Sequence, residues 1–199
     1  MRVYRCVITG NSGSAIYKEL DARYYLENCL IAGNNGHGLY GDQWSRNDAN
    51  YSFDIVHCTI VNNTSNGINQ AKIDTWPKAD LRVRNSIVAF NGLAGISANQ
   101  ASTSNVITLE YNCVYGNTGG DYALDAVAGT GSVSVNPKFN AAASGDYRLK
   151  ASSPVLDSGT NLGITADLLG NTRPDGAGPA MGCYELGVPI PAGTVVLLR

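Results

Sequence analysis

Charged residues are scarce in this chain. Lys and Arg contribute 14 of the 199 residues, and Asp and Glu contribute 16. Together they make up 15% of the sequence, whereas globular chains carry about 25%. A disordered acidic or basic segment needs more charge than this, and a net charge of −2 provides no cationic surface for nucleic acid. The composition therefore excludes a disordered tail and argues against a general nucleic-acid-binding protein.

Methionine and long apolar runs are also rare. The chain has 2 Met residues and few helix-forming runs, which nearly excludes a helical bundle. The longest apolar stretch near either end runs from Val195 to Leu198, far short of the roughly 20 residues of a membrane-spanning helix. No apolar leader follows Met1. The protein is therefore either cytoplasmic or has lost its start together with any signal peptide, and the repeats described below favour the second.

Glycine and asparagine are abundant instead, with 23 and 20 residues, and both favour turns. Aligning the cysteines reveals five copies of one motif at successive offsets of 23, 29, 28 and 27 residues. The copies are Arg5-Cys6-Val7-Ile8, Asn28-Cys29-Leu30-Ile31, His57-Cys58-Thr59-Ile60, Asn85-Ser86-Ile87-Val88 and Asn112-Cys113-Val114-Tyr115.

A turn-forming Asn follows each copy. It lies five residues after the Cys or Ser in four copies and one residue earlier in the fifth, giving Asn11, Asn34, Asn63, Asn91 and Asn117. A Gly-aliphatic pair comes next in the middle copies, as Gly38-Leu39, Gly67-Ile68 and Gly95-Ile96. Residues upstream of each copy alternate apolar and polar, as in a strand. Each copy is therefore predicted to form two or three short strands that bury a core only by stacking on the next copy.

The sequence thus predicts an all-β fold, a right-handed parallel β-helix of about five coils over residues 1–135. A leucine-rich repeat has a similar period, but its helical side is missing here. Ile16, Leu20 and Tyr24 are spaced four apart. No other copy repeats that spacing, so we interpret Ile16–Leu26 as a local turn of helix at most.

From residue 136 the repeats give way to five ordered motifs. They are Asn136-Pro137-Lys138-Phe139, Gly145-Asp146-Tyr147-Arg148-Leu149, Ser153 to Thr160, Asp167 to Pro174 and Met181-Gly182-Cys183-Tyr184-Glu185. This series resembles the C-terminal region of the bacterial choice-of-anchor Q domain family, with departures at Thr172 and Cys183. The resemblance implies a β-helix on a secreted or surface-displayed bacterial protein, an irregular strand-rich closing segment over residues 136–186, and structural roles for Asp157, Asp167 and Glu185.

Residues 187–199 form an apolar tail. Val188-Pro189-Ile190-Pro191 followed by Thr194 to Leu198 is similar to the opening of a sorting anchor, but it lacks the usual Glu between the prolines. We favour an apolar terminal strand packed on the coil over a truncated anchor.

We expect the cysteines to be free. Cys6, Cys29, Cys58 and Cys113 are predicted to occupy the same place in successive coils, where parallel strands lie about 4.8 Å apart. The Cβ atoms of a disulfide lie closer, at about 3.8 Å. An interior ladder of thiols, with Ser86 filling one rung, is therefore predicted.

No metal site is predicted, because the sequence has no Cys-x-x-Cys or paired His spacing. No cofactor is expected, although bound Ca²⁺ stays open. His57 stands where other copies have Asn and is predicted to replace it in a ladder. His37 is predicted to be a solvated turn residue.

The copies lengthen at one place, directly after the Gly-aliphatic strand. Insertions that gather on one side of a coil often form its binding face, and both tryptophans lie in them. The candidate ligand-binding residues are Trp44, Trp76, Asp42, Arg46, Asp48, Lys72, Asp74 and Lys78.

An indole flanked by hydrogen-bonding side chains suits a sugar ring, so the predicted partner is a polysaccharide or other glycan. The alternative is that the tryptophans only cover the apolar side of the coil. The sequence therefore predicts an extracellular β-helix module with a carbohydrate-facing or structural role and no catalysis.

Two further functions stay open. A polysaccharide lyase or glycoside hydrolase could draw its acids and cations from the insertions, although no signature fixes them. An open coil end also favours self-association into a head-to-tail filament.

Overall fold

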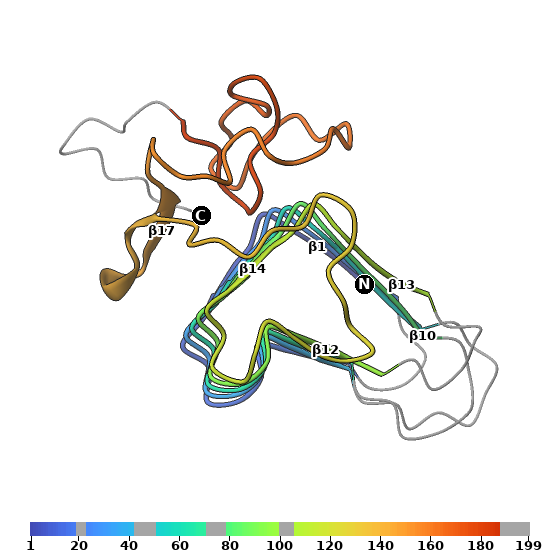
Figure 1. Cartoon of the computed structure of the whole chain (residues 1–199). Coiled ribbons are helices and arrows are strands. Elements are labelled where there is room, and N and C mark those ends of the chain that lie inside the picture. Colours follow the sequence, from blue (N-terminus) through green and yellow to red (C-terminus); the bar gives the residue numbers. More distant parts are fainter. Residues whose placement is uncertain (19–22, 42–50, 71–78, 100–105, 188–199) are drawn as a thin grey trace.

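The computed structural model describes residues 1–18, 23–41, 51–70, 79–99 and 106–187, and it shows three parallel sheets stacked into a coil (Figure 1). Sheet A contains β1 (Arg2–Tyr4), β4 (Arg23–Glu27), β7 (Tyr51–Val56), β10 (Ala79–Arg84) and β13 (Ile107–Glu110). Sheet B contains β2 (Val7–Thr9), β5 (Leu30–Ala32), β8 (Thr59–Val61), β11 (Ile87–Ala89) and β14 (Cys113–Tyr115). Sheet C contains β3 (Ile16–Lys18), β6 (Leu39–Gly41), β9 (Ile68–Gln70), β12 (Ile96–Ala98) and β15 (Tyr122–Leu124).

Each coil contributes one strand to each sheet, and each strand pairs in parallel with its counterparts in the neighbouring coils. The predicted parallel β-helix of about five coils is therefore confirmed. In the stretch Ile16–Leu26, interpreted as a local turn of helix at most, the described residues form strands β3 and β4, and residues 19–22 lie outside the described residues. Ile16 lies in sheet C and Tyr24 in sheet A.

Strand alternation fills the interior of the coil. In sheet A, Phe53 and Ile55 of β7 stack in register on Leu81 and Val83 of β10, and all four side chains are fully buried. Sheets B and C add Ile31, Ile60, Val88, Leu39, Ile68 and Ile96 to the same core. Burial of this apolar surface is the main gain from stacking, since no single coil can enclose it.

A ladder of asparagine side chains runs along the turn between sheets B and C. The side-chain amide of each Asn donates to the side-chain oxygen of the Asn in the next coil: Asn11 to Asn34 at 2.8 Å, Asn34 to Asn63 at 2.8 Å, Asn63 to Asn91 at 3.0 Å and Asn91 to Asn117 at 2.9 Å. Each acceptor oxygen also binds the backbone N–H of the donating Asn. The ladder ends on the carboxylate of Asp121, 3.2 Å from Asn117 Nδ2.

The predicted ladder of interior thiols next to sheet B is wrong at its last rung. Cys6, Cys29, Cys58 and Ser86 occupy the first four rungs. Cys113 does not occupy the fifth, because Ile87 pairs with both Thr59 and Cys113. The fifth rung is filled by Asn112, whose Oδ1 accepts from the Ser86 backbone at 2.9 Å. The last repeat is therefore one residue shorter than the sequence alignment implied, and Asn117 lies five residues after its rung like the other ladder asparagines.

All five cysteines are free, as predicted. Each thiol of the ladder donates a hydrogen bond to the carbonyl two residues earlier, as Cys58 does to Val56 at 3.4 Å. The hydroxyl of Ser86 donates in the same way to the Arg84 carbonyl at 3.0 Å. Cys113 lies in a second apolar cluster, where burial raises its pKa to about 12. Thiols in such surroundings are inert rather than nucleophilic.

The closing segment packs on the outer surface of sheet B (Figure 1), so β5, β8 and β11 are buried on both faces, whereas the outer face of β2 is exposed. It contains the antiparallel pair β16 (Phe139–Ala141) and β17 (Asp146–Leu149), joined by the short 3-10 helix η1 (Ala142–Ser144). Val155, Met181 and Cys183 are fully buried against Leu30, Val61 and Ala89 in the second cluster. The apolar tail, residues 187–199, lies outside the described residues apart from Gly187.

We predict that Asn63→Ala destabilises the protein by roughly 2 to 4 kcal/mol, because it leaves buried polar groups of three neighbouring segments without partners. Asn63 is 1% exposed and bonds Asn34, Asn91 and the Ile31 carbonyl. Denaturation in guanidinium chloride measures the change. Asn35→Ala, at an exposed turn position beside the ladder, is the control and should change stability by less than about 0.5 kcal/mol; equal losses would contradict the role of the ladder.

Candidate functional site

The eight predicted ligand-binding residues, Trp44, Trp76, Asp42, Arg46, Asp48, Lys72, Asp74 and Lys78, lie outside the described residues. The strands that flank them are described. β6 and β9 of sheet C precede the two segments, and β7 and β10 of sheet A follow them. Both segments therefore connect the same two sheets, and each leads directly into a strand of sheet A.

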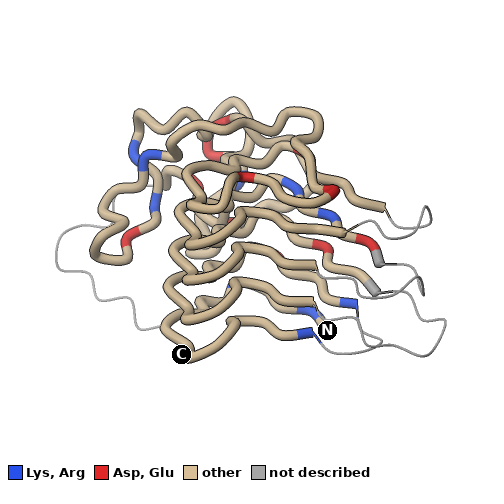
Figure 2. Tube along the Cα trace, turned by 60° about the horizontal axis from the view of Figure 1, so that its bottom comes forward, with Lys and Arg blue, Asp and Glu red and all other residues tan. Residues whose placement is uncertain are grey.

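Charged strand residues of the coil are concentrated on sheet A. The strands of sheet B contain none and those of sheet C contain only Lys18. We define the charged face as the outward-facing charged residues of sheet A: Arg2, Arg23, Glu27, Asp54, Asp80, Arg82, Arg84 and Glu110. In Figure 2 the charged residues of the coils accordingly gather on one side of the stack, and the row of turns opposite carries almost none.

The charges of this face pair along and across the strands. Arg84 of β10 binds Asp54 of β7 at 3.0 Å, and Arg82 binds Asp80 within β10 at 3.0 Å. The first pair is possible because the register places Arg82 opposite Asp54 and Arg84 one pleat further along. Arg82 and Arg84 keep 38% and 29% of their side chains exposed, so the exposed part of each guanidinium group can reach a ligand, whereas Nε of Arg84 is buried.

Tyrosines complete the face at its N-terminal end. The hydroxyl of Tyr25 donates to Glu27 at 2.7 Å, and the Arg2 guanidinium lies 5.9 Å from the Tyr25 ring centroid. Burial, followed by the hydrogen bond to Glu27, raises the pKa of Tyr25, so the phenol stays a donor. Tyr4 and Tyr25 pack with ring centroids 5.6 Å apart, which gives a half-exposed aromatic surface beside the charges.

This arrangement presents several hydrogen-bonding groups together. The carboxylates of Glu27, Asp54 and Asp80 each accept a hydrogen bond from Tyr or Arg, so donors and acceptors are held side by side on this face. The charged face thus offers paired donors, acceptors and apolar rings to a polar ligand.

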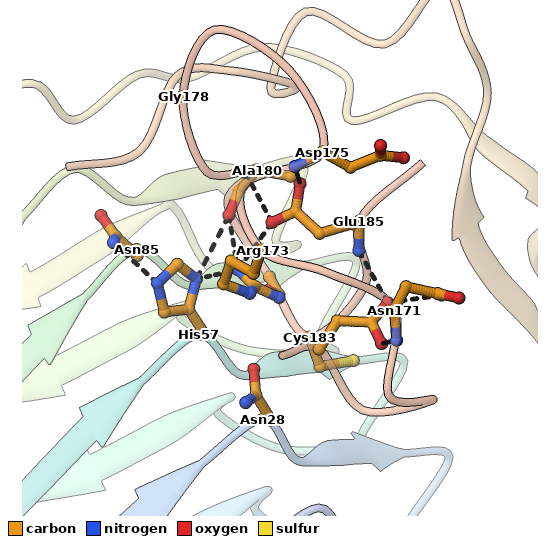
Figure 3. A network of polar contacts seen from close by, with 12 residues as sticks. Asn28, His57, Asn85, Asn171, Arg173, Asp175, Gly178, Ala180, Cys183 and Glu185 are labelled. Carbon is orange, nitrogen blue, oxygen red and sulfur yellow. Dashed lines mark hydrogen bonds and ion pairs between the residues drawn. The ribbon is translucent and has the colours of Figure 1, made fainter. Parts of the chain in front are cut away.

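A second polar cluster joins the coil to the closing segment (Figure 3). Arg173 and Glu185 form an ion pair at 3.2 Å with side chains 0% and 2% exposed. Arg173 also donates to the carbonyls of Ala180 at 2.9 Å and Gly182 at 3.0 Å and lies against Nδ1 of His57. Glu185 accepts from the Ala180 backbone at 3.0 Å.

Burial dominates the electrostatics of this cluster. It lowers the pKa of Arg173 and raises the pKa of Glu185 in spite of their attraction. It also lowers the pKa of His57 to about 2, with the Arg173 charge as the next cause. Because His57 and Arg173 are 1% and 2% exposed, no substrate reaches them, and we assign the cluster to docking of the closing segment rather than to catalysis.

His57 replaces an asparagine, as predicted. Asn28, His57 and Asn85 all adopt positive φ angles at equivalent corners of successive coils, and Nδ2 of Asn85 lies 2.9 Å from Nε2 of His57. The prediction for His37 is wrong in part, because its ring stacks on Tyr40 at 5.0 Å and its Nδ1 accepts from the Asn66 backbone at 3.1 Å. A turn between coils packs against its neighbours, unlike an isolated surface turn.

The acids of the terminal motifs hold backbone in place. Asp167, fully buried, accepts from the backbones of Leu169, Asn171 and Glu185. Asp157 accepts from the Gly178 backbone at 3.2 Å. No group of His, Cys, Asp or Glu with metal-binding geometry occurs in the part of the chain that the structure describes. Among the same residues, no helix is long and apolar enough to span a membrane.

The fold and its exposed face define a parallel β-helix protein closed on one side by an irregular C-terminal segment. Residues 21–167, about three quarters of the chain, match the family described as disaggregatase related. The chain belongs to this family. Comparison with curated proteins and with solved structures gave no match. The similarity of residues 136–185 to the choice-of-anchor Q domain family stays a prediction, since no comparison supports it.

We predict that His57 makes the protein acid-sensitive. The folded state keeps His57 neutral down to about pH 2, whereas the unfolded chain protonates it near 6.5. Between these values the unfolded state binds one proton more, so stability falls with pH by about 1.4 kcal/mol per unit below 6.5. Urea denaturation of the wild type and of His57→Asn from pH 7 to 4 measures the difference.

The variant carries the residue found at the equivalent corners and should lose this pH dependence. Glu185, whose raised pKa acts in the opposite direction, is present in both proteins and cancels from the comparison. Parallel stability curves for the two proteins would contradict the prediction.

Proposed function

We propose that this protein is an extracellular or cell-surface module that binds a glycan along the charged face of sheet A, without cleaving it. The observation that supports the proposal is the concentration of the charged strand residues of the coil on one exposed sheet, together with Tyr4 and Tyr25. A binding surface built on strands is rigid, and the three inner strands of sheet A, β4, β7 and β10, are each held by two neighbours.

The insertions extend this face in the proposal. The segments with Trp44 and Trp76 lead into β7 and β10, which carry Asp54, Arg82 and Arg84. An indole supplies apolar area to a sugar ring, while Arg and Asp bind its hydroxyl groups. Asp42, Arg46, Asp48, Lys72, Asp74 and Lys78 would add polar contacts from the same two segments.

The family description is in keeping with such a role. It names a disaggregatase, and a protein related to one is expected to contact material that holds an aggregate together. Glycans are a chemistry that the charged and aromatic residues of sheet A would recognise. The surface display that the resemblance of residues 136–185 implies would place the module where such glycans occur.

We expect Trp44→Ala and Trp76→Ala each to weaken polysaccharide binding about ten-fold or more, as loss of a central aromatic contact does. Arg82→Met should weaken it about two- to five-fold, because its charge is partly exposed. A screen of neutral and uronate polysaccharides by affinity electrophoresis, followed by calorimetry on the best ligand, measures these changes. Thr118→Ala, on the exposed turn edge, is the matched control.

Three results would overturn the proposal. They are silence across the whole polysaccharide panel, binding that all three substitutions leave unchanged, and release of reducing ends or unsaturated products during the screen. The last result would assign the same face to a lyase or hydrolase. Electron microscopy of the same protein shows whether binding requires filaments formed by self-association.

A further inference from the structure

An open pocket lies where the closing segment meets the turn after β11. Its volume is about 410 Å³, within the range of small-molecule sites. It is lined by Phe90, Asn136, Lys138, Phe139, Ala142, Lys150 and Ser152. The closing segment covers sheet B, so this pocket is separate from the charged face of sheet A.

Phe90 supplies one wall of the pocket and departs from the repeat. It adopts φ +57 at the turn position that other coils fill with Gly10, Gly33, Asn62 and Gly116, all at positive φ. This left-handed conformation is unfavourable for a bulky residue. A Cβ on Gly116 would meet the Phe90 ring at 3.1 Å, so the glycine of the next coil leaves room for the ring.

Phe90 and Phe139 form an apolar corner. Their ring centroids lie 6.3 Å apart with an edge-to-face angle of 68°. Phe90 also packs edge-on against Tyr115 at 5.7 Å, and Phe139 against Tyr147 at 5.4 Å. The two rings are thus held from behind, and part of Phe90 stays exposed at the pocket.

Two lysines, Lys138 and Lys150, give the pocket positive charge beside this apolar corner. The Lys150 backbone donates to the Lys138 carbonyl at 3.1 Å, which places the two residues side by side. The ammonium of Lys138 donates to the Ser152 carbonyl at 3.1 Å, so its charge is held at the pocket. No carboxylate lines the pocket, and within the described ranges neither lysine forms an ion pair.

We propose that this pocket binds a single sugar ring that carries a carboxylate or sulfate group. Lys138 and Lys150 pair with the anion, and the C–H groups of the ring pack on Phe90 and Phe139. The side chain of Asn136 and the hydroxyl of Ser152 lie within the lining and suit the ring hydroxyls. A cationic pocket with an apolar wall discriminates this ligand from both a neutral sugar and a bare anion.

The test is an NMR titration of the full isotope-labelled chain with sodium glucuronate, glucose and inorganic sulfate in parallel. Glucuronate should give saturable shifts at Lys138, Lys150 and Ser152, and glucose should not. Lys150→Gln should weaken glucuronate binding about two- to five-fold, and added NaCl should weaken it further. Phe90→Asn, which restores the residue of the preceding coil, should weaken glucuronate binding and leave the weaker binding of sulfate unchanged.

Asn35→Ala serves as the control, because Asn35 is exposed and lies in neither the pocket lining nor the charged face, and it should leave glucuronate shifts unchanged. The polysaccharide screen with the tryptophan variants tests sheet A separately, because no residue of the pocket belongs to that sheet. Non-saturating shifts that glucose reproduces, or equal affinity for sulfate and glucuronate, would overturn the proposal. So would glucuronate binding that Lys150→Gln and Phe90→Asn both leave intact.

Discussion

The hydrogen bonds of the asparagine ladder constrain every other part of the coil. A buried amide such as that of Asn63 has no water to bind, so its partners must come from the coils above and below. It finds them in Asn34 and Asn91 only when all three turns lie at the same height. Five residues separate each ladder Asn from its interior rung, whereas repeat lengths vary from 23 to 29 residues. The ladder thus fixes the register, and differences in repeat length fall at the corner between sheets C and A.

This register assigns different roles to the three sheets. Sheet A carries the charges, and its parallel pairing sets Arg82 opposite Asp54, so charges of opposite sign meet across strands. Sheet B carries none and is covered by the closing segment, which is tied down by the buried pair of Arg173 and Glu185. Burying that pair is costly even with its partners in place. The ion pair therefore makes docking specific, because few other placements of the closing segment would give both Arg173 and Glu185 their partners.

Sequence reasoning reached the fold because the repeat is periodic and local. It misplaced Cys113 because side-chain identity was given more weight than spacing, although the apparent early position of Asn117 already signalled a repeat one residue shorter. The buried cluster was missed for another reason. His57 and Arg173 are 116 residues apart, and no periodic pattern connects the coil to the closing segment. The charged face could have been found by counting charges strand by strand, since one strand of each coil carries nearly all of them.

Phe90 departs from the repeat at a place where the coil does something besides stacking. It stands in a column of glycines and Asn62, whereas the corner column of His57 holds Arg5, Asn28, Asn85 and Tyr111 as well. Left-handed backbone at a bulky residue costs roughly 1–2 kcal/mol, which a glycine at position 90 would avoid. The cost must be offset by contacts that glycine cannot make, and Phe90 makes them with Tyr115, Phe139 and the pocket. In a fold whose regular positions are explained by stacking, an irregular residue that is energetically unfavourable in its own coil points to an interaction outside that coil.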